Sequence, residues 1–200
     1  MKEEIIRLLL LTGRPGMDKL IKWMEQNGFF TAPCSTQHHL CKEGGLAEHS
    51  MNVYETAKTL FSTLRMVPAE LEYESIILVS LLHDIGKCGQ FGKPYYIENW
   101  VKEGRATKSN PEPQLVRSTK KPFLSNAELY NVPHEIRSLS IIDRFVDLTE
   151  DEQFAILYHN GLYGSLKYEL QGNETPLYLI LHTADMWCSR IIENEKEVEE

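Results

Sequence analysis

One apolar run near the middle of the chain constrains the fold more than any other stretch. It spans residues 76–82 and leads directly into His83-Asp84, followed by Gly86 and Lys87. Such a run predicts a buried helix or a buried strand, and periodicity alone does not separate the two. Burying a polar group without a partner costs roughly 2–7 kcal/mol, so His83 and Asp84 need compensation. A divalent cation would supply it; a capping histidine beside a solvated aspartate is the alternative.

Two further polar residues fall on stripes that are predicted to face the core. Residues 46–64 have apolar side chains at helical spacing, and His49 lies on that stripe. A last helix over about 175–195 places Asp185 in the same way, and an acidic residue facing the core needs a partner. A core-facing histidine is often a satisfied structural residue. One shared cation nevertheless explains His49, His83-Asp84 and Asp185 better than three separate coincidences.

The order His49, His83-Asp84, Asp185 resembles the metal-binding signature of the HD-domain phosphohydrolase superfamily, as does the approach to His49 through residues 44–48. The resemblance covers roughly residues 38–190. It implies one all-α domain over 1–200, an HD-domain helical bundle whose C-terminal helix, 175–195, carries a ligand. His49, His83, Asp84 and Asp185 would then hold one divalent cation.

The resemblance allows a second ion in addition to the first, and whether one or two ions bind stays open, since His134 and His159 could instead be ordinary helix-terminal histidines. His134 and His159 match, in order, the extra histidines of family members that hold two metals, and Asp84 would bridge the two ions. Some relatives have His-His where this chain has His159-Asn160. Imidazole and carboxylate ligands without thiolates suit Mn(II), Fe(II), Co(II), Ni(II) or Zn(II), and the sequence does not choose among them.

The expected activity is a metal-dependent phosphohydrolase that cleaves a nucleotide or related phosphate ester. Coordination lowers the pKa of water from about 15.7 towards 7, which provides a nucleophile at neutral pH. Asp84 would orient that water, and Lys87 would offset charge on the phosphate oxygens. Two alternatives remain open: a catalytically weak nucleotide-sensing or binding module, and a phosphodiesterase or nuclease acting on oligonucleotides or cyclic nucleotides.

Residues 88–131 break the helical pattern. Aromatic and β-branched residues over 95–101 favour a strand, so a small β-hairpin or an extended insertion is expected in the helical body. Residues 93–121 carry seven Lys or Arg against three Glu, a balance of +4 in a chain of −8. This stretch is either a solvated basic loop or a flap that steers an anion inward. Tyr95 could stack on a base, and Arg137 could bind a phosphate or form a structural ion pair.

The remaining segments are predicted as supporting structure. Residues 1–30 would form an N-terminal helical lid, with helices over 3–12 and 17–27. His38 and His39 lie in the loop that follows, where histidines are usually solvated or hydrogen-bonded; a direct metal role is the alternative. Thr149 with Glu152 three residues later predicts a capping box at the start of a helix. The Glu-rich segment 193–200 is expected to be a frayed, solvated helix end.

Composition limits the classes of partner. A net charge of −8 argues against general nucleic-acid binding, which depends on Lys and Arg, and leaves a small anionic phosphate ester as the expected substrate. The four cysteines show no CxxC pairing, and no leader or membrane span is evident, so a cytoplasmic protein with reduced thiols is expected. The sequence does not indicate an oligomeric state.

Overall fold

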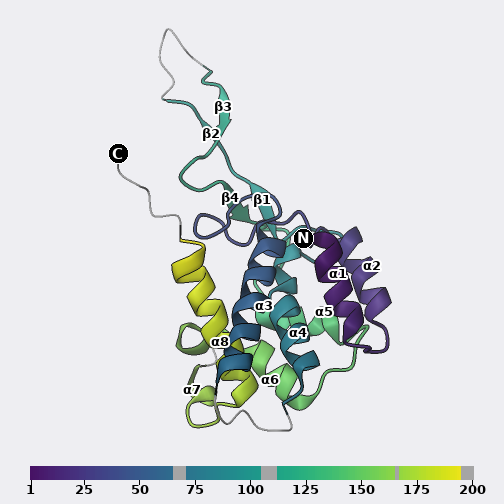
Figure 1. The fold of residues 1–200 in the computed structure, drawn as a ribbon. Coiled ribbons are helices and arrows are strands. Elements are labelled where there is room, and N and C mark those ends of the chain that lie inside the picture. The colour runs from purple at the N-terminus through teal and green to yellow at the C-terminus, as the bar shows by residue number, and fades with distance from the viewer. Residues whose placement is uncertain (65–70, 105–111, 165–166, 195–200) are drawn as a thin grey trace.

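The structure, a computed structural model, describes residues 1–64, 71–104, 112–164 and 167–194. Helices packed around α4 form the body, and an extended insertion projects from one end of it (Figure 1). The α-helices in the described ranges are α1 (Lys2–Leu11), α2 (Met17–Gln26), α3 (Gly45–Thr63), α4 (Tyr73–Leu82), α5 (His134–Ile142), α6 (Glu150–Tyr158), α7 (Lys167–Leu170) and α8 (Pro176–Trp187).

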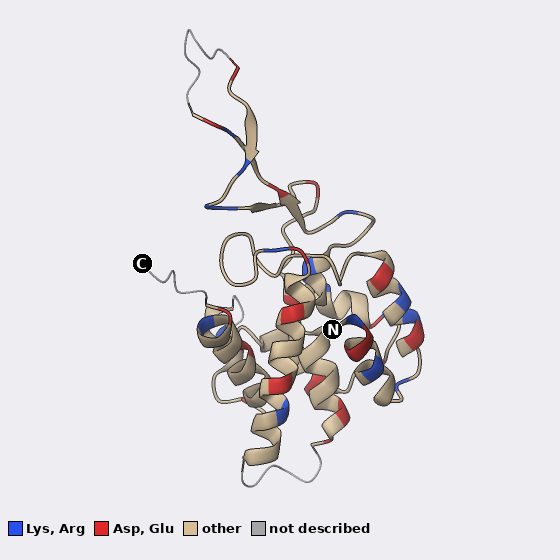
Figure 2. Ribbon diagram, turned by 45° about the horizontal axis from the view of Figure 1, so that its top comes forward, with Lys and Arg blue, Asp and Glu red and all other residues tan. Residues whose placement is uncertain are grey.

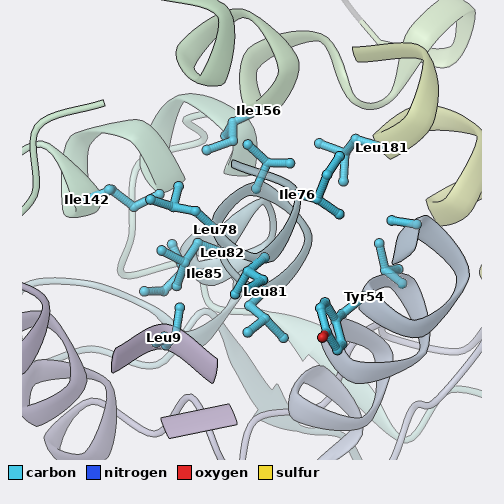
Figure 3. Close-up of a cluster of buried hydrophobic side chains, with 14 of the residues drawn as sticks. Leu9, Tyr54, Ile76, Leu78, Leu81, Leu82, Ile85, Ile142, Ile156 and Leu181 are labelled. Carbon is cyan, nitrogen blue, oxygen red and sulfur yellow. The ribbon is translucent and has the colours of Figure 1, made fainter. Parts of the chain in front are cut away.

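The apolar run of residues 76–82 is a helix, α4, and it lies at the centre of the body. Every residue from Ser75 to Leu82 is buried. Its Ile and Val residues would suit a strand, but packing against α1, α3, α6 and α8 covers the helix on all sides, and such tertiary context overrides propensity. Figure 3 shows Leu78, Leu81 and Leu82 of α4 among side chains from the surrounding helices.

The predicted helix boundaries agree with the structure to within a few residues at most ends. The stripe over 46–64 forms α3, and the N-terminal helices α1 and α2 contribute Ile5, Leu9, Leu20 and Met24 to the core. Thr149 and Glu152 form the predicted capping box of α6: the Thr149 side chain accepts from the Glu152 backbone N–H, and the Glu152 carboxylate accepts from the Thr149 N–H.

The last helix departs from the prediction in its geometry. The α-helix ends at Trp187 and continues as a π-helix over Cys188–Ile192. A π-turn is wider than an α-turn, and such turns occur often at functional sites. Glu193 follows it directly and is buried, so the expectation that the segment from Glu193 onward is solvated is wrong for this residue. Residues 195–200 lie outside the described residues.

The prediction of an all-α fold is wrong. The structure is about 53% helical and 8% strand, which makes it a mixed α/β fold. Four short strands pair as two antiparallel two-stranded sheets: β1 (Tyr96–Glu98) with β4 (Phe123–Ser125), and β2 (Trp100–Lys102) with β3 (Leu115–Arg117). The insertion has no helical periodicity, so its backbone N–H and C=O groups form hydrogen bonds between strands instead of within a helix. This explains why the fold is not all-α.

The two small sheets are successive parts of one long hairpin. Asn99 joins them, since its backbone N–H donates to Pro122 and its carbonyl accepts from Ser118. The β2–β3 part extends away from the helices, and both basic and acidic residues lie along the insertion (Figure 2). Of the seven basic residues expected there, Arg105 and Lys108 lie outside the described residues.

Within the described ranges, no helix combines the length and apolar character needed to cross a bilayer. All four cysteines are described and none forms a disulfide; Cys34, Cys88 and Cys188 are buried.

Candidate metal centre

Six polar side chains from five helical segments converge in the interior. Each comes from a position that the sequence analysis selected: His49 in α3, His83-Asp84 at the end of α4, His134 at the start of α5, His159 at the end of α6, and Asp185 in α8. The convergence depends on a close helix contact at Gly86, where an added Cβ would lie 2.3 Å from the His134 carbonyl oxygen. Gly86 therefore allows α5 to bring His134 beside Asp84.

One half of the cluster contains the four residues assigned to the first ion. His49 Nε2 lies 3.2 Å from Asp185 Oδ1 and 3.6 Å from Asp84 Oδ2. His83 Nε2 lies 3.5 Å from the same Asp84 oxygen and 3.4 Å from His49 Nε2. His49, His83 and Asp84 are fully buried, and the Asp185 side chain is 17% exposed.

The other half contains the two histidines assigned to a second ion. Asp84 Oδ1 lies 3.1 Å from His134 Nε2 and 3.5 Å from His159 Nε2, and these two nitrogens are 3.3 Å apart. Asn160, which stands where some HD proteins have a second histidine, reaches the same place: its Nδ2 lies 3.4 Å from His134 Nε2. The two carboxylate oxygens of Asp84 thus face two different pairs of imidazoles.

The outer nitrogens of the histidines fix which nitrogen faces the centre. His83 Nδ1 donates to the Ser80 carbonyl at 3.0 Å, and His159 Nδ1 donates to the Ile156 carbonyl at 2.7 Å, because a carbonyl oxygen can only accept. His49 Nδ1 lies 2.9 Å from a Glu193 carboxylate oxygen, and His134 Nδ1 lies 3.3 Å from Glu135. Such outer partners orient histidines in metal sites by leaving Nε2 free as a ligand.

The neutral form of His83 places an acceptor nitrogen opposite His49 and Asp84. Burial lowers the pKa of His83 to about 3, so its imidazole is neutral and its Nε2 carries a lone pair. That lone pair points at another imidazole nitrogen and a carboxylate. Asp84 Oδ1 is buried and forms no well-aligned hydrogen bond within the described residues, although the Nε2 atoms of His134 and His159 lie 3.1 Å and 3.5 Å from it. A cation among these atoms would remove the repulsion and satisfy the orphaned oxygen, so the donor set fits a divalent metal ion.

The Asp84 carboxylate forms an ion pair with Lys87. The Lys87 Nζ lies 2.6 Å from Asp84 Oδ2. Burial alone would raise the pKa of the Asp84 carboxyl, but Lys87 and the imidazoles hold it well below its usual range. Burial likewise lowers the pKa of Lys87, but Asp84 raises it further, and the net shift is well upward. Both groups therefore stay ionised.

The pKa of His49 shifts in the opposite direction to that of Asp84. Burial lowers its pKa, whereas Cys34 and the carboxylates of Asp185 and Glu193 raise it, and the net shift is upward. The surrounding acidic groups thus favour positive charge at this position, whether it is a proton on His49 or a metal ion beside it.

Lys87 also lines a cavity of about 290 Å³ between the α2–α3 loop and the base of the insertion. Tyr95, predicted to contact substrate, lines it together with Tyr96 and Phe123. Arg137 lies elsewhere: it is buried, donates to Gln90 Oε1 and the Tyr130 carbonyl, and its guanidinium lies 5.9 Å from the Tyr95 ring centre. The structure thus places Arg137 behind Tyr95, where it supports the wall of the cavity.

Glu193 contacts the cluster through His49, and sequence reasoning missed it. Its carboxylate accepts from Asn52 Nδ2 at 2.9 Å as well as from His49. Glu193 follows Asp185 by eight residues, a spacing that returns to the same helical face. That spacing was the available signal, although the intervening π-helix changes the phase.

Comparison with known proteins adds no identification. No family model, no curated protein and no solved structure matches the chain. The resemblance to the HD superfamily therefore remains a hypothesis that depends on the residues above.

Proposed function

We propose that the chain is a metal-dependent phosphohydrolase of the HD type, acting on a nucleotide or a related phosphate ester. The observation that carries the proposal is that the two carboxylate oxygens of Asp84 face different histidines. Oδ2 faces His49 and His83, and Oδ1 faces His134 and His159. A carboxylate shared in this way is suited to bridge two cations. His49, His83, Asp84 and Asp185 would hold one, and Asp84, His134 and His159 the other.

Divalent cations at such a centre activate water at neutral pH and polarise a phosphoryl oxygen. The rest of the chemistry falls to the protein. Glu193 and the backbone carbonyls of Ser80 and Ile156 keep the histidines in the ligand tautomer. Lys87 carries a fixed positive charge beside Asp84, where it would stabilise charge that develops on phosphate oxygens.

The cavity next to Lys87 supports a substrate with a compact, largely uncharged organic part. Its volume of about 290 Å³ is at the small end of the range for ligand pockets. Its lining includes two cations, Lys87 and Arg117, and two carboxylates, Glu43 and Glu98, so the walls carry no net charge. A sugar or base would suit these walls, with its phosphate directed toward Lys87 and the metal centre.

Tyr95 and Tyr96 give this cavity its aromatic wall. Their rings are 4.9 Å apart in an edge-to-face arrangement, and neither hydroxyl hydrogen-bonds to another of the described residues. An aromatic face with free phenol hydroxyls can both stack on a planar group and hydrogen-bond to it. This feature favours a nucleotide over a small inorganic substrate.

The test is turnover of bis-p-nitrophenyl phosphate, p-nitrophenyl phosphate and a panel of nucleotides with added Mn(II). We expect His83→Ala to lower turnover at least about 100-fold, because even outer partners of metal ligands contribute about 10–100-fold. His38→Ala is the matched control, since His38 is exposed on the α2–α3 loop, and its turnover should equal that of the wild type. Equal turnover in His83→Ala would contradict the proposal. Metal retention without any turnover would favour a sensing module instead.

A further inference from the structure

A second set of ligand-type side chains lies next to the candidate metal centre, and it contains a thiol. Cys34 is fully buried, and its Sγ lies 3.5 Å from His39 Nε2. The sulfur, one nitrogen of His39 and one nitrogen of His49 all lie within 4.8 Å of one another. We propose that Cys34, His39 and His49 form a binding site for a soft divalent ion, Zn(II) or Cd(II), that shares His49 with the candidate metal centre.

The loop that carries Cys34 and His39 holds them together by its own hydrogen bonds. The Cys34 N–H donates to the Leu40 carbonyl at 3.1 Å, and the Ser35 hydroxyl donates to the His39 carbonyl at 2.9 Å. Leu40 has φ of +46°, which is uncommon for a residue with a side chain. Strained residues of this kind persist where the surrounding structure fixes them, often at ligand sites.

The N-terminus of α3 packs closely against this loop. A Cβ at Gly45 would lie 2.0 Å from the Leu40 carbonyl oxygen, so only glycine allows the helix to begin there. His49 lies one turn further along the same helix, and its ring centre is 5.3 Å from that of His39. The loop and the helix are therefore positioned together, and with them the three ligand atoms.

The chemistry of the donors selects a soft ion. Thiolate sulfur with imidazole nitrogen favours Zn(II) and Cd(II), whereas Mg(II) and Mn(II) prefer oxygen ligands. On binding, the Cys34 thiol would release its proton to solvent and bond to the ion as a thiolate. Lys87 Nζ, 4.0 Å from the sulfur, would stabilise the negative charge.

Access for an ion is available from the side of His39. His39 and Glu193 line a cavity of about 980 Å³ between the α2–α3 loop and the π-helix that follows α8. Three protein ligands leave one tetrahedral position of Zn(II) for water or another group. Glu193, already bonded to His49, is the nearest carboxylate on that side.

Sharing of His49 has a functional consequence, which rests on the proposed function. An ion held by Cys34 and His39 would compete for a ligand of the first metal position. Zn(II) or Cd(II) should therefore inhibit Mn(II)-dependent turnover in the wild type, and Cys34→Ser should reduce that inhibition.

The site itself is tested without activity, by titrating Cd(II) into the metal-free full chain and recording the ultraviolet sulfur-to-cadmium charge-transfer band. We expect one equivalent of Cd(II) to produce the band in the wild type, and Cys34→Ser to abolish it. His39→Ala should weaken Cd(II) binding at least about tenfold. Cys41→Ser is the matched control, a nearby thiol outside the cluster, and should keep the band. A band that persists in Cys34→Ser with the fold intact by circular dichroism, or no band in the wild type, would overturn the proposal.

The two proposals fail separately. A Cys34-dependent band in a protein that hydrolyses no phosphate ester would support the thiol site and count against the phosphohydrolase. Hydrolysis without a Cys34-dependent band would do the reverse. His134→Ala should leave the band unchanged, because His134 belongs to the other half of the centre.

Discussion

The helical body and the insertion between Cys88 and Asn131 hold their structure by different means. In the body, α4 is buried on every side, and the residues of the candidate metal centre come from the end of α4 and from α3, α5, α6 and α8. In the insertion, each strand has three residues, and the side chains of β2 are all exposed. An isolated two-stranded hairpin is marginally stable in water. Metal ligands that must be held rigidly therefore lie in the helical body. The insertion contributes only the residues at its base that line the cavity beside Lys87.

Removing a glutamate from an ion pair should give the largest difference in stability between the two regions. Glu152 is fully buried and accepts hydrogen bonds from Ser75 Oγ at 2.7 Å, from the Thr149 N–H at 2.8 Å and from Arg14. Glu152→Ala would leave these donors unpaired, and we expect the free energy of unfolding to fall by about 3–5 kcal/mol.

The same substitution in the insertion is the control. Glu98 pairs with Arg117 at 3.3 Å, and both side chains are more than 40% exposed. Glu98→Ala should change stability by less than about 1 kcal/mol, since exposed pairs contribute little. Urea unfolding followed by circular dichroism measures both variants. Equal effects would show that the two regions do not differ as described.

Leucine substitutions sharpen the comparison for apolar packing. Leu81 in α4 is fully buried, and Leu81→Ala should destabilise the protein by about 2–5 kcal/mol through lost contacts and a cavity. Leu115 in β3 is 56% exposed, and Leu115→Ala should stay within about 0.5 kcal/mol. Thermal and urea unfolding of both variants give the two values. A loss above about 1 kcal/mol for Leu115→Ala would mean that the hairpin is covered in solution.

Much of the body could be predicted from sequence because its signals are local. The apolar stripe of α3 and the capping box of α6 each predicted a helix start to within one residue. The convergence of His49, His83, Asp84 and Asp185 followed from the cost of burying polar groups, since each needed a partner.

The rest depended on contacts between distant segments. The pairing of β1 with β4 joins residues about 27 positions apart, and no local pattern specifies it. The π-helix after α8 and the burial of Glu193 likewise follow from packing against α3, which the Glu-rich composition of the C-terminal segment obscured. Cys34 and His39 meet through a strained loop, and the sequence analysis, which treated Cys34 as a reduced thiol and His39 as an ordinary loop histidine, had no local pattern that joins them.

The most direct test of the central claim is metal content. Elemental analysis would be made on full-length protein purified without chelator, in a Cys34→Ser background so that the thiol site does not contribute. We predict one or two equivalents of a transition metal in this protein, loss of most of it in Asp84→Asn, and retention in Asp143→Asn, an exposed aspartate outside the cluster. His134→Ala should lower the count by one where two ions bind. Folded protein with no metal, or the same metal content in Asp84→Asn, would contradict the account.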